Sequence, residues 1–362
     1  MRPFFRHLQV VPLLVSTALA AGCVEVVDRP SDIDTLRVLA VRTDSPFTPP
    51  GSRPRIEMLL YDGSPSAVEP DTARRRVQVL WIGTCVNPPG DLYFNCYPAL
   101  RATLAALTDA DLAAERIPAG TPEGALGFGT RFSAEMPADA ISSRTAASGV
   151  VYPYGVLFVF YAACAGELRH VSDGGASGDL PIGCFRPGSD QALGQEDFEF
   201  GYYPVYAYDQ LVNHVPVAGP LAFGAGSSAT PCTDASACGA QETCGSKGMC
   251  IPVVAACSAD DADDCPPYAL EPAIDRASAE PAVSAHVPES QAKLETIWVS
   301  YYGTGGRFDK DARIVNDASA GWFDAYGGVW RAYRASGEVH LFAVVRDNRG
   351  GVTWLSQDVQ IR

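Results

Sequence analysis

Residues 338–355 read EVHLFAVVRDNRGGVTWL, and this stretch decides the fold class of the chain. Apolar and β-branched residues dominate 339–345, a polar, glycine-containing turn occupies 347–351, and an apolar run resumes at 352. Two strand-like runs joined by a short turn with glycine are typical of an antiparallel hairpin. The stretch therefore predicts strands that pair through tight turns.

Further runs of the same kind occur earlier in the chain: LRVLAV (36–41), RIEMLLY (55–61), VQVLWI (77–82) and TIWVSYY (296–302). Turns rich in Gly, Pro and Asp separate them, which favours an antiparallel sandwich or barrel.

Two other segments have patterns of their own. The apolar block 149–164 predicts a fully buried pair of strands. The Ala/Leu-rich stretch 98–116 predicts one or two short helices, one of them starting near Thr108.

The runs at 36–41 and 299–308, together with 344–352, resemble Ig-like modules of bacterial envelope lipoproteins. The resemblance implies sandwich folds and a role outside the cytoplasm, and it carries no catalytic residue. We therefore predict a mainly β fold with two Ig-like antiparallel β-sandwich domains, a short helical insertion and a disulfide-rich knob. The domains are expected at 35–212 and 213–362. The second is interrupted by a cysteine-rich insert (232–265) and an Ala/Pro-rich linker (266–292).

The N-terminus has the parts of a secretory signal. Arg2 and Arg6 precede an apolar stretch, and small residues lead directly to Cys23. The run LAAGC at 19–23 resembles a bacterial lipobox, which implies that residues 1–22 are removed and that Cys23 carries a lipid. A plain signal peptide is the alternative. Residues 23–34 would form a tether, and Val24 after the acylation site implies residence at the outer membrane, with the protein facing the periplasm or the surface.

The other ten cysteines form an even set, which in an exported chain indicates five disulfides. Local loops favour Cys85–Cys96 and Cys164–Cys184, with Cys85–Cys164 as the alternative. The insert resembles short disulfide modules of secreted bacterial proteins. For it we favour the pairs Cys232–Cys244, Cys238–Cys250 and Cys257–Cys265. Zinc is the rival interpretation of these cysteines, but the spacings are not C-x2-C and the insert has no histidine.

An aromatic run at 198–208 offers two interpretations. Tyr202, Tyr203, Tyr206 and Tyr208 could present rings for stacking against sugars. However, aromatic residues at every second position also suit one buried face of a strand, and this second interpretation is favoured.

Charge restricts the partners. Asp and Glu number 42 against 27 Lys and Arg, which argues against binding to nucleic acid. The aspartates at 260–264 lack the spacing of a calcium loop, so a solvated acidic loop is favoured over a calcium site. No metal and no cofactor are expected.

Catalytic motifs of the common hydrolase and nucleotide-binding families are absent from the sequence. The histidines at 170, 214, 286 and 340 lie far apart in sequence and are taken as surface or packed residues. The sequence therefore predicts a non-enzymatic binding or structural module, held to the membrane by its N-terminal lipid, that contacts an envelope protein or a polysaccharide. The alternative is a secreted hydrolase, such as a carbohydrate-active enzyme, that uses a carboxylate pair without a recognisable motif.

Overall fold

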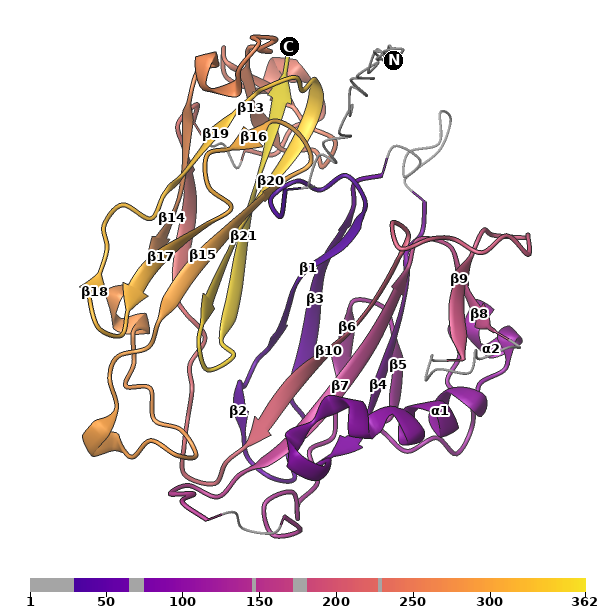
Figure 1. The fold of residues 1–362 in the computed structure, drawn as a ribbon. Helices are drawn as coiled ribbons and strands as arrows, with labels where there is room; N and C mark the ends of the chain where they lie inside the picture. The colour runs from indigo at the N-terminus through magenta and orange to yellow at the C-terminus, as the bar shows by residue number, and fades with distance from the viewer. Residues whose placement is uncertain (1–28, 65–74, 145–147, 172–180, 227–229) are drawn as a thin grey trace, which may run out of the picture.

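The computed structural model describes residues 29–64, 75–144, 148–171, 181–226 and 230–362. Strands dominate these residues and gather into packed sheets, with two short α-helices and a disulfide-rich module (Figure 1). The predicted mainly β fold class is confirmed.

The strands up to Ala207 form two larger sheets and one small one. The first sheet has three strands in the order β1 (Leu36–Thr43), β3 (Arg55–Asp62) and β6 (Arg131–Ser133). The second has five, in the order β2 (Phe47–Thr48), β10 (Phe198–Ala207), β7 (Gly155–Cys164), β4 (Gln78–Val86) and β5 (Leu126–Phe128). The small sheet pairs β8 (Glu167–His170) with β9 (Ile182–Phe185).

The three- and five-stranded sheets pack face to face around Trp81, which is fully buried. Its ring stacks on Phe132 at 5.8 Å and meets Tyr161 edge-on at 5.7 Å. Its indole N–H donates to the carbonyl of Gly129 over 2.7 Å, so the one polar atom of this large side chain is satisfied.

The apolar block 149–164 forms one strand, and the predicted pair is wrong. β7 is buried at each of its ten positions, because β4 and β10 flank it and both faces of the sheet are covered. A turn at 148–149 and a bend at 151–152 lead into the strand.

The predicted helices are α1 (Tyr97–Ala105) and α2 (Asp109–Ala113). Thr108 caps α2 in a reciprocal arrangement with Asp111, as the sequence indicated. Leu100 and Leu104 are fully buried against the outer face of the five-stranded sheet. Two 3-10 turns, η2 (Pro89–Asp91) and η3 (Tyr93–Cys96), lead into α1.

The second set of strands begins at Ala218 and forms two further sheets. One has the order β11 (Ala218–Phe223), β14 (Tyr268–Ile274), β19 (Gly328–Arg331) and β16 (Arg307–Phe308). The other has the order β12 (Glu242–Cys244), β13 (Cys250–Val254), β21 (Val352–Ile361), β20 (Gly337–Asp347), β15 (Ile297–Gly303), β17 (Ala312–Asp317) and β18 (Gly321–Trp322). The hairpin predicted at 338–355 is β20–β21, whose strands pair antiparallel from Gly337–Ile361 to Arg346–Val352.

The segment 266–292 is not a linker throughout. Its first part is β14, a strand between β11 and β19 with Leu270 fully buried in the core beside Trp330. Leu270, Pro272 and Ile274 of β14 point inward, and the glutamate and the two alanines that alternate with them are exposed. Because only alternate residues are buried and one of them is Pro272, the sequence of this segment does not resemble a buried strand.

The sheets stack as four layers, and the three-stranded sheet lies in the interior of the stack (Figure 1). One face of β1–β3 packs on the five-stranded sheet, and its other face packs on β20–β21 of the second region. Leu39 and Phe342 meet in this second contact, and the Arg346 guanidinium donates to the carbonyl of Leu39 over 2.5 Å. The strands 36–41 and 55–61 are therefore apolar on both faces.

The described part of the predicted tether, residues 29–34, is also packed. Ile33 is buried and donates its N–H to the carbonyl of Gly303 over 2.9 Å. The N–H of Gly303 donates in turn to the carbonyl of Ser31 over 2.9 Å, so backbone pairing and the buried Ile33 side chain hold the segment against β15.

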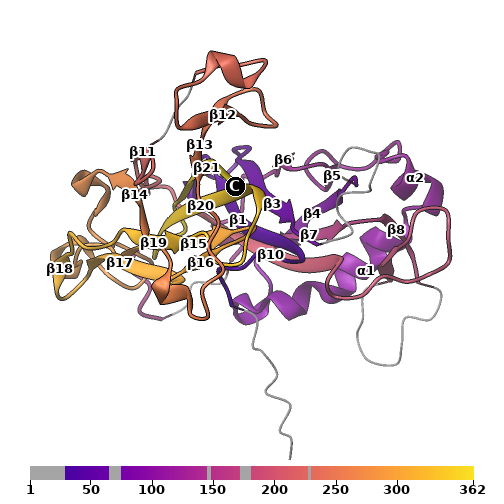
Figure 2. The same cartoon turned by 90° about the horizontal axis from the view of Figure 1, so that it is seen from above.

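Five disulfides are present: Cys85–Cys96, Cys164–Cys184, Cys232–Cys244, Cys238–Cys250 and Cys257–Cys265. These are the pairs that the sequence analysis favours. The insert contains η4 (Ala235–Ala237) and η5 (Ala262–Asp264), and around β12 it projects from the sheets (Figure 2). Its strand β13 pairs in parallel with β21, so the module is joined to the large sheet. Two more 3-10 turns, η6 (Arg276–Ser278) and η7 (Glu289–Gln291), follow.

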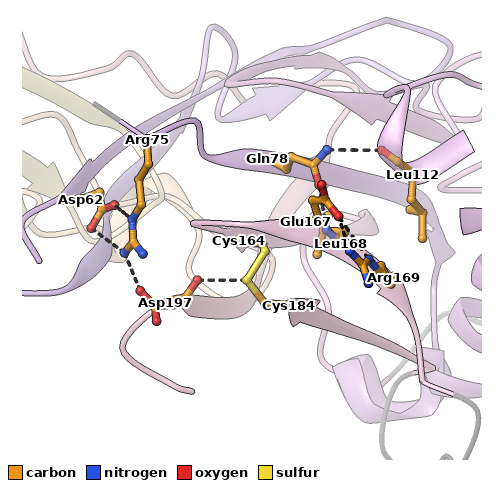
Figure 3. The surroundings of a disulfide bond; sticks show 10 residues. All are labelled: Asp62, Arg75, Gln78, Leu112, Cys164, Glu167, Leu168, Arg169, Cys184 and Asp197. Atoms are coloured by element: carbon orange, nitrogen blue, oxygen red, sulfur yellow. Dashed lines mark hydrogen bonds and ion pairs between the residues drawn. A yellow bond between two sulfur atoms is a disulfide. The ribbon is translucent and has the colours of Figure 1, made fainter. Parts of the chain in front are cut away.

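Figure 3 shows how one disulfide belongs to a wider set of ties. Cys164–Cys184 joins the end of β7 to β9. Nearby, Arg75 forms ion pairs with Asp62 of β3 and with Asp197, just before β10 (Figure 3). The ion pairs of Arg75 thus link the two facing sheets at this end, and the disulfide ties the small sheet to β7.

Candidate aromatic binding site

The four tyrosines of the run 198–208 separate by position on the strand. Tyr202 and Tyr206 lie on the face of β10 that carries the helices, because successive side chains of a strand point to opposite faces. Tyr203 lies on the other face and donates its hydroxyl to the carbonyl of Gly350 over 2.9 Å. Tyr208 follows the strand and is buried beside Phe47. Tyr203 and Tyr208 have the packed role that the sequence analysis favours, whereas Tyr202 is 40% exposed.

Two separate groups of rings lie along this face of β10. At one end, Tyr202 stacks on Tyr93 at 4.3 Å, and Tyr93 meets Tyr97 at 6.2 Å. At the other end, Tyr206 lies 6.1 Å from Tyr154, whose ring is 5.9 Å from Tyr208. Tyr202 and Tyr206 are four residues apart, about 13 Å along a strand. We call this set the tyrosine row: Tyr97, Tyr93, Tyr202, Tyr206, Tyr154 and Tyr208.

Local structure holds the first end of the row in place. Tyr93 begins η3 and Tyr97 begins α1, and the Cys85–Cys96 disulfide ties this segment to β4. Leu92 and Phe94 beside them are 45% and 48% exposed. The apolar surface of this end is therefore open to solvent.

The second end opens into a cavity of about 430 Å³ at the junction of the two regions. Phe47, Tyr206 and Tyr208 contribute rings from the first region, and Ala285 and Arg349 line it from the second. Phe47 is held beside Tyr206 because β2 pairs with the end of β10. Pockets at such junctions are frequent small-molecule sites, commonly about 300–1,000 Å³ in volume.

A charged triad borders this cavity. Asp91 accepts two hydrogen bonds of 2.7 Å from the Arg144 guanidinium and one of 2.6 Å from the Tyr154 hydroxyl. Burial raises the pKa of Asp91, but these hydrogen bonds outweigh it and the net pKa is lowered. Burial and the bond to Asp91 raise the pKa of Tyr154 to about 12. At neutral pH the triad is therefore a carboxylate held by a cation and a phenol.

Arg349 is held by two acidic residues. The Arg349 guanidinium is ion-paired with Glu280, at 2.9 Å, and with Glu295. Glu295 is fully buried, and burial together with the charge of Asp347 raises its pKa to about 7. Arg349 in turn lies 5.3 Å from the ring of Phe47, a cation–π contact. The Arg349 guanidinium that lines the cavity is thus held in position by its two ion pairs.

This arrangement suits binding more than hydrolysis. Flat rings with hydroxyl tips, a carboxylate and a guanidinium match the apolar faces and hydroxyl groups of a sugar. Glycoside hydrolysis needs two carboxyl groups across the scissile bond. Among the described residues that line the cavity, only Asp91 has a carboxylate, and it is engaged by Arg144 and Tyr154.

Sequence reasoning found the tyrosines of β10 and missed their partners. Asp91 lies in the turn after Pro88 and Pro89 with a positive φ of 55°, and turn residues of this kind give no functional signal in a single sequence. Tyr154, Arg144 and Phe47 reach the row only through tertiary packing. Cys23, the predicted lipid site, lies outside the described residues.

The acidic loop of the insert is engaged in local contacts. Asp261 caps η5 by accepting the N–H of Asp263 over 3.1 Å, and Asp263 lies 3.6 Å from Arg331. In the described part of the chain, no helix is long and apolar enough to cross a bilayer.

Comparisons with known proteins add little. No protein-family model matches the chain, and no curated protein matches it. Among solved structures, the Clostridium thermocellum CbhA fibronectin(III)-like modules align over 89% of this chain and 94% of theirs, with 10% identity and a TM-score of 0.18. With a TM-score this low, nothing about the fold or the function of this chain follows from the alignment.

Proposed function

We propose that this protein is a non-enzymatic, saccharide-binding lipoprotein of the bacterial cell envelope. The observation that carries the proposal is the tyrosine row, which runs from exposed rings at Tyr202 to the cavity at Tyr206 and Tyr154. A row longer than one sugar ring suits a polysaccharide chain better than a free monosaccharide.

The energetics support this assignment. Stacking a sugar on an exposed tyrosine removes apolar area from water, and Asp91 and the tyrosine hydroxyls supply directional hydrogen bonds. Within each of the two groups the rings contact one another, so little side-chain freedom is lost when a ligand binds.

The location at the envelope rests on the N-terminal sequence. The lipobox-like run ending at Cys23 would provide a lipid anchor, and five disulfides suit an oxidising compartment. Labelling cells with a clickable fatty acid tests the anchor. Incorporation that is lost in Cys23→Ala supports it, and incorporation unchanged in that variant refutes it.

The binding test uses an array of bacterial surface polysaccharides, followed by calorimetry with each one retained. Tyr202→Ala and Tyr206→Ala should each weaken binding by about fivefold, since stacked aromatic contacts contribute on the order of 1 kcal/mol. Phe323→Ala removes an exposed ring from the second region and serves as the matched control. Equal affinity in all three variants, or release of reducing sugar ends by the wild type, would reject the proposal.

A further inference from the structure

Three potential metal ligands lie together on β20 and β21, outside the tyrosine row. His340 is directly opposite Asp358 in the strand register, and Glu338 is two residues from His340 on the same face. The ligand atoms of all three side chains lie within 4.8 Å of one another. Sheet register alone therefore brings together an imidazole and two carboxylates.

These groups are largely shielded from water. His340 is 7% exposed, and its ring lies 5.2 Å from that of Tyr61. The Asp358 side chain is 11% exposed and contacts His340 Nδ1 over 2.6 Å.

The cysteine-rich insert covers this cluster with two residues. Ser246 donates its N–H and its hydroxyl to the two oxygens of Glu338, over 2.8 and 2.7 Å. Lys247 places its ammonium 2.8 Å from Asp358 Oδ2 and 3.0 Å from Oδ1. Lys247 is 57% exposed, so its long side chain can leave without unfolding the insert.

We propose that Glu338, His340 and Asp358 form a binding site for a divalent transition-metal ion of the Zn²⁺ class, and that the ion displaces the ammonium of Lys247. Imidazole nitrogen and carboxylate oxygen are ligands that zinc accepts. Two carboxylates balance the dication once the lysine has left. Ser246 would orient Glu338 from outside the ligand set, as hydrogen-bonding neighbours of metal ligands commonly do.

A second group of potential ligands does not compete with this site. Cys232, Cys238 and Cys250 also converge, but each sulfur is already in a disulfide. A disulfide sulfur lacks the thiolate that zinc binds.

The test is calorimetry of Zn²⁺ binding to the full chain, purified without a histidine tag, with its disulfides intact and with prior removal of metal by a chelator. We expect one ion per chain, and His340→Ala and Glu338→Gln should each weaken binding by at least about tenfold. Lys247→Met should tighten binding, because the competing cation is gone. His286→Ala is the matched control, since this exposed histidine hydrogen-bonds the carbonyl of Gly149 and lies outside the cluster.

Three results would overturn the proposal: no binding by the wild type and by Lys247→Met, affinity unchanged in both ligand variants, or weaker binding in Lys247→Met. Circular dichroism of each variant shows whether the fold is kept. Glu338 is half-buried, so Glu338→Gln still tests the site if His340→Ala fails to fold. Visible absorption of bound Co²⁺ gives a second readout, because it reports coordination directly.

Discussion

At the scale of single residues, several partly buried carboxylates form ion pairs with a cationic side chain. Asp62, Asp91 and Asp358 each have a cationic partner, and the pKa of each is lowered. Glu295 differs, because one of its oxygens, Oε2, has no hydrogen-bond partner and its pKa is raised to about 7. The junction between the two regions thus contains an acid that is costly to ionise.

This acid should make stability fall as pH rises. Its pKa is 4.5 in the unfolded chain and about 7 in the folded one, so the folded state binds the extra proton between these values. Asp347 beside it has a raised pKa and acts in the same direction. We therefore expect the free energy of unfolding to decrease by about 2 kcal/mol from pH 5 to pH 8.

Glu295→Gln should flatten this dependence, because the substituted amide does not titrate. Urea unfolding of both proteins at the two pH values measures the effect. The lowered pKa values of Asp62, Asp91 and Asp358 do not interfere, since their contribution is lost only below about pH 4. An equal loss of stability in Glu295→Gln would assign the effect to another group.

At the scale of single elements, sequence patterns predicted both helices and the long strands β1, β3, β4, β15, β20 and β21. They failed for strands that are buried on both faces or that carry few apolar residues. The ten apolar residues of β7 suggested two strands because a central strand covered on both faces has no polar alternation. β14 was missed for the opposite reason, since every second residue is exposed and polar or small. The helix cap at Thr108 was found because its signal is local.

The cap gives a direct test at this scale. Thr108→Ala removes the hydroxyl that accepts the N–H of Asp111 over 3.1 Å, and we expect a loss of about 1 kcal/mol in the free energy of unfolding. Thr103→Ala is the matched control, because that hydroxyl bonds to a carbonyl of its own helix. Thermal unfolding of both variants should show a lower midpoint for Thr108→Ala alone; equal midpoints would contradict the role of the cap.

In the loop-entropy model, a disulfide stabilises the fold more when it closes a longer loop, with the logarithm of the loop length. Cys164–Cys184 spans 20 residues and Cys257–Cys265 spans eight. Replacing the first pair by serine should cost about 3 kcal/mol in the loop-entropy model, and replacing the second pair should cost less. Urea unfolding of the two double variants checks the order, and a larger loss from the shorter loop would contradict it.

At the scale of the whole molecule, the candidate site shows what a single sequence cannot supply. The aromatic run at 198–208 marked β10, but Asp91 reaches the cavity from a turn and Arg349 reaches it from the other region. Arg144 joins them by its hydrogen bonds to Asp91. Their convergence follows from how the layers stack, and no local pattern encodes it. The same stacking brings Ser246 of the insert to Glu338 of the large sheet.

The interior three-stranded sheet should make the two regions unfold together. β1 and β3 bury one face against each neighbouring sheet, so separating either pair of sheets exposes apolar area on a shared element. Phe342 is 6% exposed and packs with Leu39 and Tyr61 where the two regions meet. Truncating a buried phenylalanine costs about 3–5 kcal/mol.

We therefore expect Phe342→Ala to convert one calorimetric unfolding transition into two, because the less stable region can then unfold before the other. Phe323→Ala removes an exposed ring of the same region and should leave a single transition with nearly the same midpoint. Two transitions already present in the wild type would show that each region unfolds by itself. The cavity would then depend on docking between regions, because Arg349 of the second region lines it together with Tyr206 of the first.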